Sequence, residues 1–558
     1  MSSTNNLPTN DKLDALVVGA GFSGLYQLYQ LRKLGYSVKL FESGSDVGGV
    51  WYWNCYPGAR VDSETPSYEY SLPELWKEWR WTQRFPDRNE LYSYFQYVAE
   101  KLDLKKDIAF NTRVTAARFD PNTDRWTVTT EQDTVVYSSF LLLAVGSASK
   151  PYIPDFPGLD KFQGILHHTA NWPQDGVDME GKRVGVIGTG STAVQFISEI
   201  GPKVKHLTVF QRLPAVVLPK VNSKVDDEKH ARMRELSPLI YRHRKQTASG
   251  HTVRSFPQDT FSVSSEERQL MWEELWSRGG LNFCGENYRD VMIDQGANDE
   301  VYAFWRNKIR AKLNDPVMQE KLAPRVAPYP FAAKKPIMDD SYYKVLNQSN
   351  VDLIDVRKML IQGITSKGVL TSDIEYEVDI LVIACGFDGA TGSITQIDIR
   401  GLDGTSIKDK WTKGVYTNLG MMAANFPNMF IIHGPQSPSI LSNAPTCIEI
   451  QCDWITNCIE YLKNNRITRI EVTREAEDEW RDLVMSVAGG TLFSKAESWW
   501  NGANIPGKPV EPLYFAGGIP YYDSILQEQE KNGYADFNLS SHGQTATTNF
   551  ENKYSANL

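Results

Sequence analysis

Residues 14–24 read Asp-Ala-Leu-Val-Val-Gly-Ala-Gly-Phe-Ser-Gly and open the part of the chain that decides the fold. Within and after this stretch, residues 15–18 have the apolar run of a short buried strand, and residues 23–34 favour a helix. A second apolar run follows at residues 38–41. This order predicts a βαβ unit with a glycine-rich turn between its first strand and its helix.

The turn has a G-x-G-x-x-G pattern that suits a dinucleotide. Glycines let the backbone approach a pyrophosphate, while the helix N-terminus supplies amide donors and positive potential. Glu42 ends the second strand, where a carboxylate can accept hydrogen bonds from ribose hydroxyls. The alternative is a tight strand–helix turn without a ligand. The expected contacts are Gly19, Gly21, Phe22, Ser23, Gly24 and Glu42.

A second unit of this kind starts at residue 183, with strand-like runs at residues 184–187 and 207–210. Its second strand ends in Gln211 and Arg212 instead of an acid. A carboxylate would repel a 2'-phosphate, whereas a guanidinium can hold it, so this unit favours NADP. Alternatively, Arg212 is a surface cation. The expected contacts are Thr189, Gly190, Ser191, Thr192, Gln195 and Arg212.

Length and charge narrow the class of protein. A chain of 558 residues is too long for one core and predicts two to four domains. The net charge of -9, without a run rich in Lys and Arg, excludes a nucleic-acid partner. The six cysteines have no metal-ligand spacing, so no metal site is expected. With neither a signal-peptide core nor a membrane-span run, we expect a cytoplasmic protein.

Between the two glycine turns lies an F-x-G-x-x-x-H-x-x-x-W-P stretch, formed by Phe162, Gly164, His168, Trp172 and Pro173. At this chain's composition, the first four positions would match by chance in roughly six of ten thousand such chains. The stretch resembles the signature of the flavin-dependent Baeyer–Villiger monooxygenases. These enzymes insert one oxygen atom of O2 beside a ketone carbonyl.

Further segments carry the same resemblance, which covers roughly residues 14–520. Residues 48–62 resemble a second family pattern, [A/G]-G-x-W, then [F/Y]-P-[G/M], then Asp62. Residues 498–509 look like the family's C-terminal active-site loop. Residues 379–388 are similar to its A-T-G-F-D linker, with Cys385 for Thr, and residues 434–443 to a flavin-domain loop.

The resemblance implies an α/β fold with two Rossmann-like domains, one for FAD and one for NADP, and an inserted helical subdomain. Charged, helix-favouring sequence from residue 224 supports the insertion. The expected divisions are an FAD domain at 1–150 and 386–533, an NADP domain at 151–223 and 329–385, a helical insertion at 224–328, and a loosely held polar tail at 534–558.

The implied activity is NADPH- and O2-dependent conversion of a ketone into an ester or lactone through a C4a-peroxyflavin. The cofactors would carry the chemistry. Further FAD contacts implied by the resemblance are Gly49, Val50, Trp51, Asp62, Tyr68, Gln436 and Ser437. For NADP they are Lys334, with Arg212 at the 2'-phosphate, and Trp499. The sequence does not indicate which ketone is used, nor the oligomeric state.

The family's catalytic cation is an arginine in a G-x-K-R-P segment. Residues 329–336 correspond to it, with Ala332 for the glycine and Lys335 for the arginine. Lysine supplies the charge without a planar fork and can lose its proton when buried, whereas Asp62 could keep it charged. We therefore expect Lys335 and Asp62 to be catalytic, unless the alignment is shifted or ketone oxidation is weakened.

Three alternatives stay open from the sequence. The first is a flavin monooxygenase that oxygenates sulfur or nitrogen, the second a largely uncoupled NADPH oxidase, and the third a flavin-bound sensor or scaffold. His168 invites a role as general base, but its place between the domains favours anchoring of the linker. Trp499 is expected to close the pocket against the nicotinamide nucleotide; core packing is the alternative.

Overall fold

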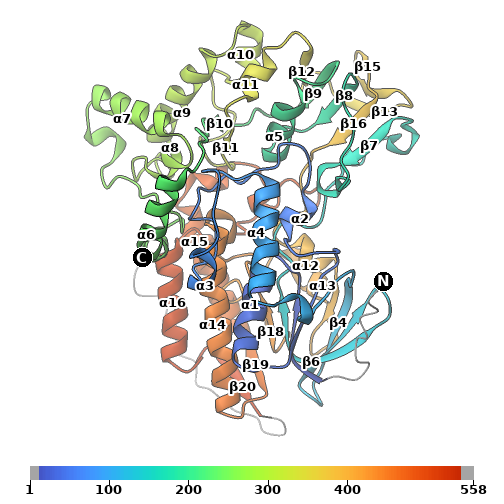
Figure 1. Ribbon diagram of the computed structural model, residues 1–558, viewed down its shortest axis with the longest axis vertical. Helices are drawn as coiled ribbons and strands as arrows, with labels where there is room; N and C mark the ends of the chain where they lie inside the picture. Colours follow the sequence, from blue (N-terminus) through green and yellow to red (C-terminus); the bar gives the residue numbers. More distant parts are fainter. Residues whose placement is uncertain (1–11, 542–558) are drawn as a thin grey trace.

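Two sheets organise the computed structural model, which describes residues 12–541. Figure 1 shows each sheet in its own lobe, with the chain crossing between the lobes. The larger sheet has the order β17-β4-β5-β6-β1-β2-β3, with β18 paired to β6. Its strands are β1 (Lys12–Val18), β2 (Val38–Phe41), β3 (Ile108–Ala109), β4 (Val114–Asp120), β5 (Arg125–Thr130), β6 (Val135–Leu143), β17 (Asp398–Arg400) and β18 (Met429–Ile431).

The predicted first βαβ unit forms the middle of this sheet. β1 pairs in parallel with both β2 and β6, and Leu16 and Val17 are fully buried, as expected for a strand covered on both faces. Helix α1 (Phe22–Lys33) connects β1 to β2 and packs against α14 (Ala444–Asn464). Strands and helices from both ends of the sequence therefore share one lobe.

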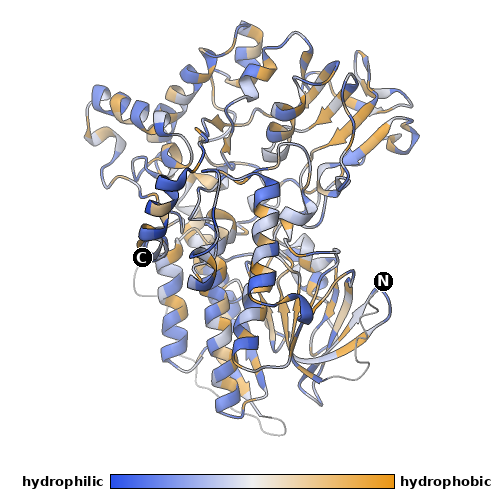
Figure 2. Ribbon diagram, in the orientation of Figure 1, coloured by the Kyte–Doolittle hydropathy of each residue, from blue (hydrophilic) through white to orange (hydrophobic). Residues whose placement is uncertain are grey.

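Other helices complete this first lobe. They are α2 (Val50–Trp53), α3 (Pro73–Trp76), α4 (Arg88–Lys101), α12 (Gly392–Thr395), α13 (Ile407–Lys410), α15 (Arg474–Gly489) and α16 (Ile519–Lys531). Figure 2 shows apolar residues concentrated on the strands of both sheets. The first lobe therefore has a conventional layered core.

The second lobe contains five parallel strands in the order β12-β9-β8-β16-β7. They are β7 (Ile165–His168), β8 (Arg183–Ile187), β9 (His206–Gln211), β12 (Val351–Asp355) and β16 (Ile380–Ile383). Helix α5 (Ser191–Ile200) connects β8 to β9, which gives the second predicted βαβ unit. Because β7 and β16 pair, the chain enters and leaves this lobe along neighbouring strands.

The predicted helical insertion is present. Its helices are α6 (Asp227–Arg244), α7 (Ser265–Arg278), α8 (Asn282–Gly285), α9 (Gln295–Arg310) and α10 (Pro316–Leu322). Trp272 and Phe304 of the insertion share one hydrophobic core with Val209 of the second sheet. Strand β10 (Val217–Leu218), before the insertion, pairs with β11 (Ile337–Met338), after it. Helix α11 (Tyr342–Leu346) and a small sheet of β13 (Ile361–Ile364), β14 (Gly368–Thr371) and β15 (Glu375–Glu377) come later in the chain.

Helix α6 is hydrophilic along most of its length in Figure 2, so hydrophobic burial alone does not hold it. At its end, Arg244 donates hydrogen bonds of 2.8 Å to the carbonyl oxygens of Ser67 and Glu69. It also donates to Glu449 Oε2 at 2.8 Å, and both side chains of this ion pair are 0% exposed. The insertion is thus tied to the first lobe by a fully buried charge.

A second buried carboxylate lies beside this ion pair. Glu69 accepts hydrogen bonds from Tyr241 of α6 at 2.5 Å and from the Trp81 indole at 2.6 Å. Burial raises the pKa of Glu69 to about 7, although these two bonds and the charge of Arg244 oppose the shift. The charge of Arg244 therefore acts on two buried carboxylates, Glu449 and Glu69.

Residues 534–541 differ from the loosely held tail expected for them. Strand β20 (Phe537–Ser540) pairs antiparallel with β19 (Arg469–Val472), and Tyr534 and Phe537 are buried against the core of α14. Apolar residues spaced through a polar stretch made this strand hard to detect. Residues 542–558 of the expected tail lie outside the described residues. Across residues 12–541, no helix combines the length and apolar character needed to cross a membrane.

Replacement of Arg244 by Met should lower the free energy of unfolding by about 3–5 kcal/mol, because Glu449 would stay buried without its cation. Adding Glu449→Leu should recover much of the loss, since the uncompensated charge is then removed. Urea unfolding would measure both. Arg289→Met, which breaks an exposed pair with Asp259, is the control and should leave stability unchanged. Additive losses in the double variant would contradict this account.

Candidate active site

The first glycine turn has no room for side chains. Gly19 has a φ of +104°, and a Cβ placed on it would lie 2.5 Å from the carbonyl oxygen of Ala144. A Cβ on Gly24 would lie 1.8 Å from the carbonyl oxygen of Gly19. Gly24 therefore brings α1 close to β1, and its contribution is packing within the turn.

Two glycine-containing segments meet at this turn. Gly49, with a φ of +54°, begins α2, and a Cβ on it would lie 2.9 Å from the Cα of Gly21. Bare backbone from both segments thus forms one wall, as close approach to a phosphate-bearing ligand requires. The first turn and the residues 48–62 motif are brought together, as the resemblance implied.

A cavity of about 540 Å³ opens beside this wall. It extends to the chain crossings between the lobes, where Ser149, Pro151, Asn171 and Phe387 line it. An elongated cavity lined by close-packed glycines fits a dinucleotide. The predicted FAD contacts that line it are Gly19, Gly21, Phe22, Ser23, Glu42, Gly49, Val50, Trp51 and Tyr68.

Glu42 lines this cavity and also shapes the turn. Its Oε2 accepts a hydrogen bond from the Ala20 amide and its Oε1 one from the Gly44 amide, both at 2.7 Å. Nearby, the Trp51 indole donates to the Tyr68 hydroxyl at 3.2 Å. The glutamate therefore holds the backbone of the turn, and its contact with a ribose stays a prediction.

The structure does not place Gln436 and Ser437 on the cavity wall. Gln436 accepts hydrogen bonds from the amide and hydroxyl of Thr417 and donates to the carbonyl oxygen of Val415. Ser437 donates to the carbonyl oxygen of Gly434. Both side chains are buried and bonded within the protein, so they organise the loop behind the cavity.

His433 reaches the cavity from this loop and was missed by the sequence reasoning. Its φ is +61°, its amide donates to Gln451 at 2.7 Å, and its buried Nε2 has no hydrogen-bond partner in the described part of the chain. Burial lowers its pKa to about 4, so the ring is neutral at physiological pH. Its position directly before the recognised loop at residues 434–443 was the available signal.

The second glycine turn is built like the first. Gly188 has a φ of +117°, and its Cβ would lie 2.4 Å from the carbonyl oxygen of Ala384, whereas Gly190 faces open space. Ser191 and Thr192 occupy the first turn of α5 and are partly exposed. The side chain of Thr189 donates to the carbonyl oxygen of Leu213 at 2.9 Å, so it braces the turn.

Gln195 joins the two lobes. Its Oε1 accepts a hydrogen bond from the Tyr56 hydroxyl, and its Nε2 donates to the carbonyl oxygen of Arg60, both at 2.9 Å. A Cβ on Gly58 would lie 2.5 Å from the carbonyl oxygen of Gln195. The Tyr-Pro-Gly part of the residues 48–62 motif therefore docks on α5, and both ends of the Gln195 side chain are engaged there.

Positive charge gathers where a 2'-phosphate was predicted. Burial, and then the charge of exposed Arg212, together lower the pKa of Lys334 to about 8. The Lys334 Nζ also lies 4.9 Å from the centre of the Tyr329 ring. A bound dianion would stabilise the protonated form of a lysine held in this way.

The expected pair of Lys335 and Asp62 is formed. Lys335 Nζ lies 2.7 Å from Asp62 Oδ2, and the side chains are 46% and 11% exposed. Asp62 Oδ1 is buried and has no hydrogen-bond partner within residues 12–541. Lys335 therefore satisfies only one of the two carboxylate oxygens of Asp62.

Ala332 occupies the position where the family pattern has glycine, and its φ is +60°. This left-handed conformation is unfavourable for a residue with a Cβ. The departure noted in the sequence therefore introduces backbone strain three residues before Lys335.

The four residues of the linker motif lie where the chain enters the second lobe. A Cβ on Gly164 would lie 2.5 Å from the carbonyl oxygen of Asp379, and Phe162 packs beside it. His168 is buried beside Phe387 of the second crossing, and burial lowers its pKa. Trp172 packs edge-on against Phe196 of α5. A buried neutral His168 supports the anchoring interpretation.

Trp499 begins a short 3-10 helix, η8 (Trp499–Asn501), at the start of the predicted C-terminal loop. It is partly buried, and its ring lies so close to Gly389 that a Cβ there would meet Trp499 Cε3 at 2.7 Å. The tryptophan thus lies against Gly389, two residues after the cavity-lining Phe387 in sequence, and does not itself line the cavity.

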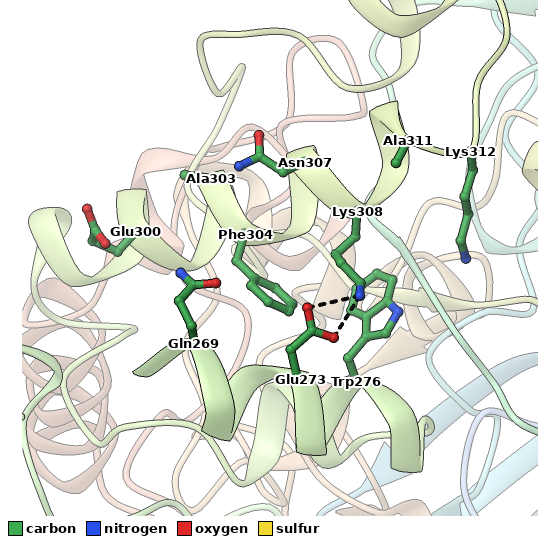
Figure 3. A pocket seen from close by; sticks show the side chains of 10 residues that line it. All are labelled: Gln269, Glu273, Trp276, Glu300, Ala303, Phe304, Asn307, Lys308, Ala311 and Lys312. Atoms are coloured by element: carbon green, nitrogen blue, oxygen red, sulfur yellow. Dashed lines mark hydrogen bonds and ion pairs between the residues drawn. The ribbon is translucent and has the colours of Figure 1, made fainter. Parts of the chain in front are cut away.

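Another hollow, of about 490 Å³, lies between α7 and α9 of the insertion and contains none of the predicted site residues. Figure 3 shows Lys308 bonded to both carboxylate oxygens of Glu273, above Trp276 and Phe304. Of the charged residues that line this hollow, Lys308 and Glu273 pair with each other, and Glu300 pairs with Arg268 outside it. In residues 12–541, no group of three or more His, Cys, Asp or Glu side chains could hold a metal ion.

Replacing Ala332 by Gly should raise the free energy of unfolding by about 0.5–1 kcal/mol, because relief of the left-handed strain exceeds glycine's extra chain entropy. Urea unfolding would measure the change. Ala333→Gly is the matched control: Ala333 is fully buried and lacks a positive φ, so this change should destabilise. Destabilisation by both changes would contradict the strain at Ala332.

Comparison with known proteins agrees with this geometry. A family model described as flavin-binding monooxygenase-like matches residues 12–227. The chain is 44% identical over 536 residues to cyclopentanone 1,2-monooxygenase of Comamonas sp. (strain NCIMB 9872), covering 96% of this chain and 98% of that protein. It is 38% identical to cyclohexanone 1,2-monooxygenase of Acinetobacter sp., over 94% of this chain and 96% of that protein.

A solved structure extends the agreement to the whole fold. The crystal structure of OTEMO in complex with FAD and NADP superposes with a TM-score of 0.92 at 38% identity, covering 95% of this chain and 99% of that one. The two Rossmann-like lobes, both glycine turns and the connecting motif thus occur together in one architecture. The chain belongs to the Baeyer–Villiger monooxygenases, the FAD- and NADPH-dependent enzymes that convert ketones into esters or lactones.

Proposed function

We propose that this enzyme oxidises a ketone with the Asp62–Lys335 pair as its fixed catalytic charge. The observation that carries the proposal is the 2.7 Å contact between Lys335 Nζ and Asp62 Oδ2. The charge of Asp62 also reaches Tyr68, which lines the cavity. Burial raises the pKa of Tyr68 to about 12, and the negative charge of Asp62 contributes to this rise. The pair therefore lies within electrostatic range of the cavity wall.

Bound FAD would supply the oxygenating chemistry, with electrons from NADPH and oxygen from O2. The task of the protein is to stabilise negative charge that develops on oxygen when a carbonyl is attacked, and to exclude water. A lysine ammonium has three N–H donors. Asp62 takes one of them and holds the ammonium in place, so two remain for the reacting oxygen.

Cyclic ketones are the substrates to test first. The relatives named above act on cyclopentanone and cyclohexanone, and both match nearly the full length of the chain. A neutral ketone matches a site in which the fixed charge pair is already balanced, because binding then adds no net charge. Oxidation of the carbonyl is the function that this arrangement supports best.

We also propose which cofactor each lobe binds, and the composition of the two sheets supports this assignment. We assign residues 12–150 and 386–541 to the FAD domain, with β20 included, and residues 151–223 and 329–385 to the NADP domain, with residues 224–328 inserted. Support comes from β17 and β18, which join the first sheet after residue 386, and from β12 and β16, which join the second before it. Arg212 and Lys334 would hold the 2'-phosphate, and Trp499 would close over the nucleotide.

Lys335→Ala should still allow flavin reduction by NADPH but lower ester or lactone formation about a hundred- to a thousandfold, because a preorganised donor is lost. Product analysis with cyclopentanone, with hydrogen peroxide measured in parallel, would test this. Lys335→Arg asks whether a fork that also reaches Asp62 Oδ1 improves ketone oxidation. Full lactone yield in Lys335→Ala, without peroxide, would place the catalytic cation elsewhere.

The kcat/KM for NADPH should fall as the pH rises above about 8. Lys334, whose pKa is lowered to about 8, binds a 2'-phosphate only while it is protonated, and that proton is lost above this pH. The pH profile of kcat/KM reports groups of the free enzyme. Lys334→Arg should keep NADPH use constant across this range, and NADH is the control. A parallel fall with NADH would show that Lys334 does not act on the phosphate.

A further inference from the structure

The C-terminal loop at residues 502–509 has no regular secondary structure. A buried ion pair joins it to a residue outside the loop. Lys508 Nζ lies 2.8 Å from Asp388 Oδ1, and the two side chains are only 13% and 15% exposed. Asp388 follows directly on the second crossing between the lobes. A charged loop residue thus binds a charged linker residue away from solvent.

Asp388 binds a second lysine with its other oxygen. Lys150 Nζ lies 3.0 Å from Asp388 Oδ2, and the Asp388 amide donates to the carbonyl oxygen of Lys150. Lys150 lies in the first crossing, between Ser149 and Pro151, so one carboxylate joins both crossings to the loop. Burial by itself would raise the pKa of Asp388, but Lys508 and Lys150 outweigh it and the net pKa is lowered.

Other contacts between loop and linker surround this ion pair. Lys508 also donates to the carbonyl oxygen of Gly389 at 2.9 Å, and the Asn504 amide donates to that of Phe387 at 2.8 Å. Trp499 lies against Gly389, with no room for a Cβ between them. Three consecutive linker residues, 387–389, therefore contact the loop in three different ways.

We propose that Asp388 is a positioning residue that latches the C-terminal loop to both interlobe crossings and so sets the position of Trp499. Its carboxylate neutralises Lys508, and the loop stays folded only while the crossings keep their present arrangement. Lobe movement during turnover would then be transmitted to the loop through one charged contact. The effect on NADPH use rests on the proposed role of Trp499.

The first test measures order in the loop directly. In the FAD-loaded enzyme with NADP+, amide hydrogen exchange of residues 498–509 should become about ten- to a hundredfold faster in Asp388→Asn and Lys508→Met, since a charge-assisted hydrogen bond is lost. The double variant should be little worse than either single one. Asp259→Asn, the same change at an exposed ion pair, is the matched control and should leave this exchange unchanged.

Unchanged exchange of residues 498–509 in both single variants would overturn the latch. If Asp388→Asn fails to fold, exchange of residues 498–509 in Lys508→Met and Gly389→Ala tests the latch in its place. The methyl group that Gly389→Ala adds would displace Trp499 without changing the charges. Faster exchange spread over both lobes in Lys508→Met would also overturn it, since the pair would then be a general stability element.

Steady-state kinetics separate the latch from the role of Trp499. Latch variants should raise the KM for NADPH and lower the product formed per NADPH consumed, and Trp499→Ala should do the same without further loss in combination. Faster loop exchange with unchanged NADPH kinetics would keep the latch and refute the role of Trp499. Impaired kinetics in Trp499→Ala alone, with the loop still protected in the Asp388 variant, would refute the latch.

Discussion

A guanidinium with no exposed surface fixes how the helical insertion meets the first lobe. Arg244 ends a mostly polar helix and is compensated by Glu449 of α14 and by two backbone carbonyls of residues 67–69. Removing a cation from water costs several kcal/mol unless such partners are in place, so these segments must stay together in the folded state. The following segment, at residues 245–251, is thereby held on the first lobe, where Gly518 and Thr446 contact it.

This arrangement also brings positive charge towards the reaction centre. Burial lowers the pKa of His251 to about 3, and the charges of Arg244 and Lys335 contribute to the shift. The structural cation and the proposed catalytic one are therefore within electrostatic range of the same imidazole. Asp62 balances Lys335 and Glu449 balances Arg244, so each of these cations has its own carboxylate partner.

The parts that could be predicted from the sequence are those set by local backbone geometry. Both glycine turns and their flanking strands were predicted correctly because glycine spacing and apolar runs are constrained within about 30 residues. The substitution at Ala332 was visible as a departure from a pattern, and the structure adds its positive φ.

The remainder depended on contacts between distant segments. A motif marked the loop at residues 434–443, yet only the fold shows that Gln436 is turned into the protein and His433 towards the cavity. Arg244 and its buried partner Glu449 are more than 100 residues apart in sequence. The same holds for Asp388 and each of the two lysines that bind it. No periodicity or spacing records such pairs. Strand β20 escaped detection because its pairing with β19 brings together residues about 70 apart.

The docking of Gln195 has a consequence for motion. Its side chain makes two hydrogen bonds to the other lobe, to the Tyr56 hydroxyl and the Arg60 carbonyl oxygen. At about 1 kcal/mol net for each, a lobe rotation that breaks both would cost about 2 kcal/mol. Such a difference leaves a few per cent of molecules in the rotated arrangement at any moment. These two bonds are thus strong enough to favour one orientation of the lobes and weak enough to leave another one populated.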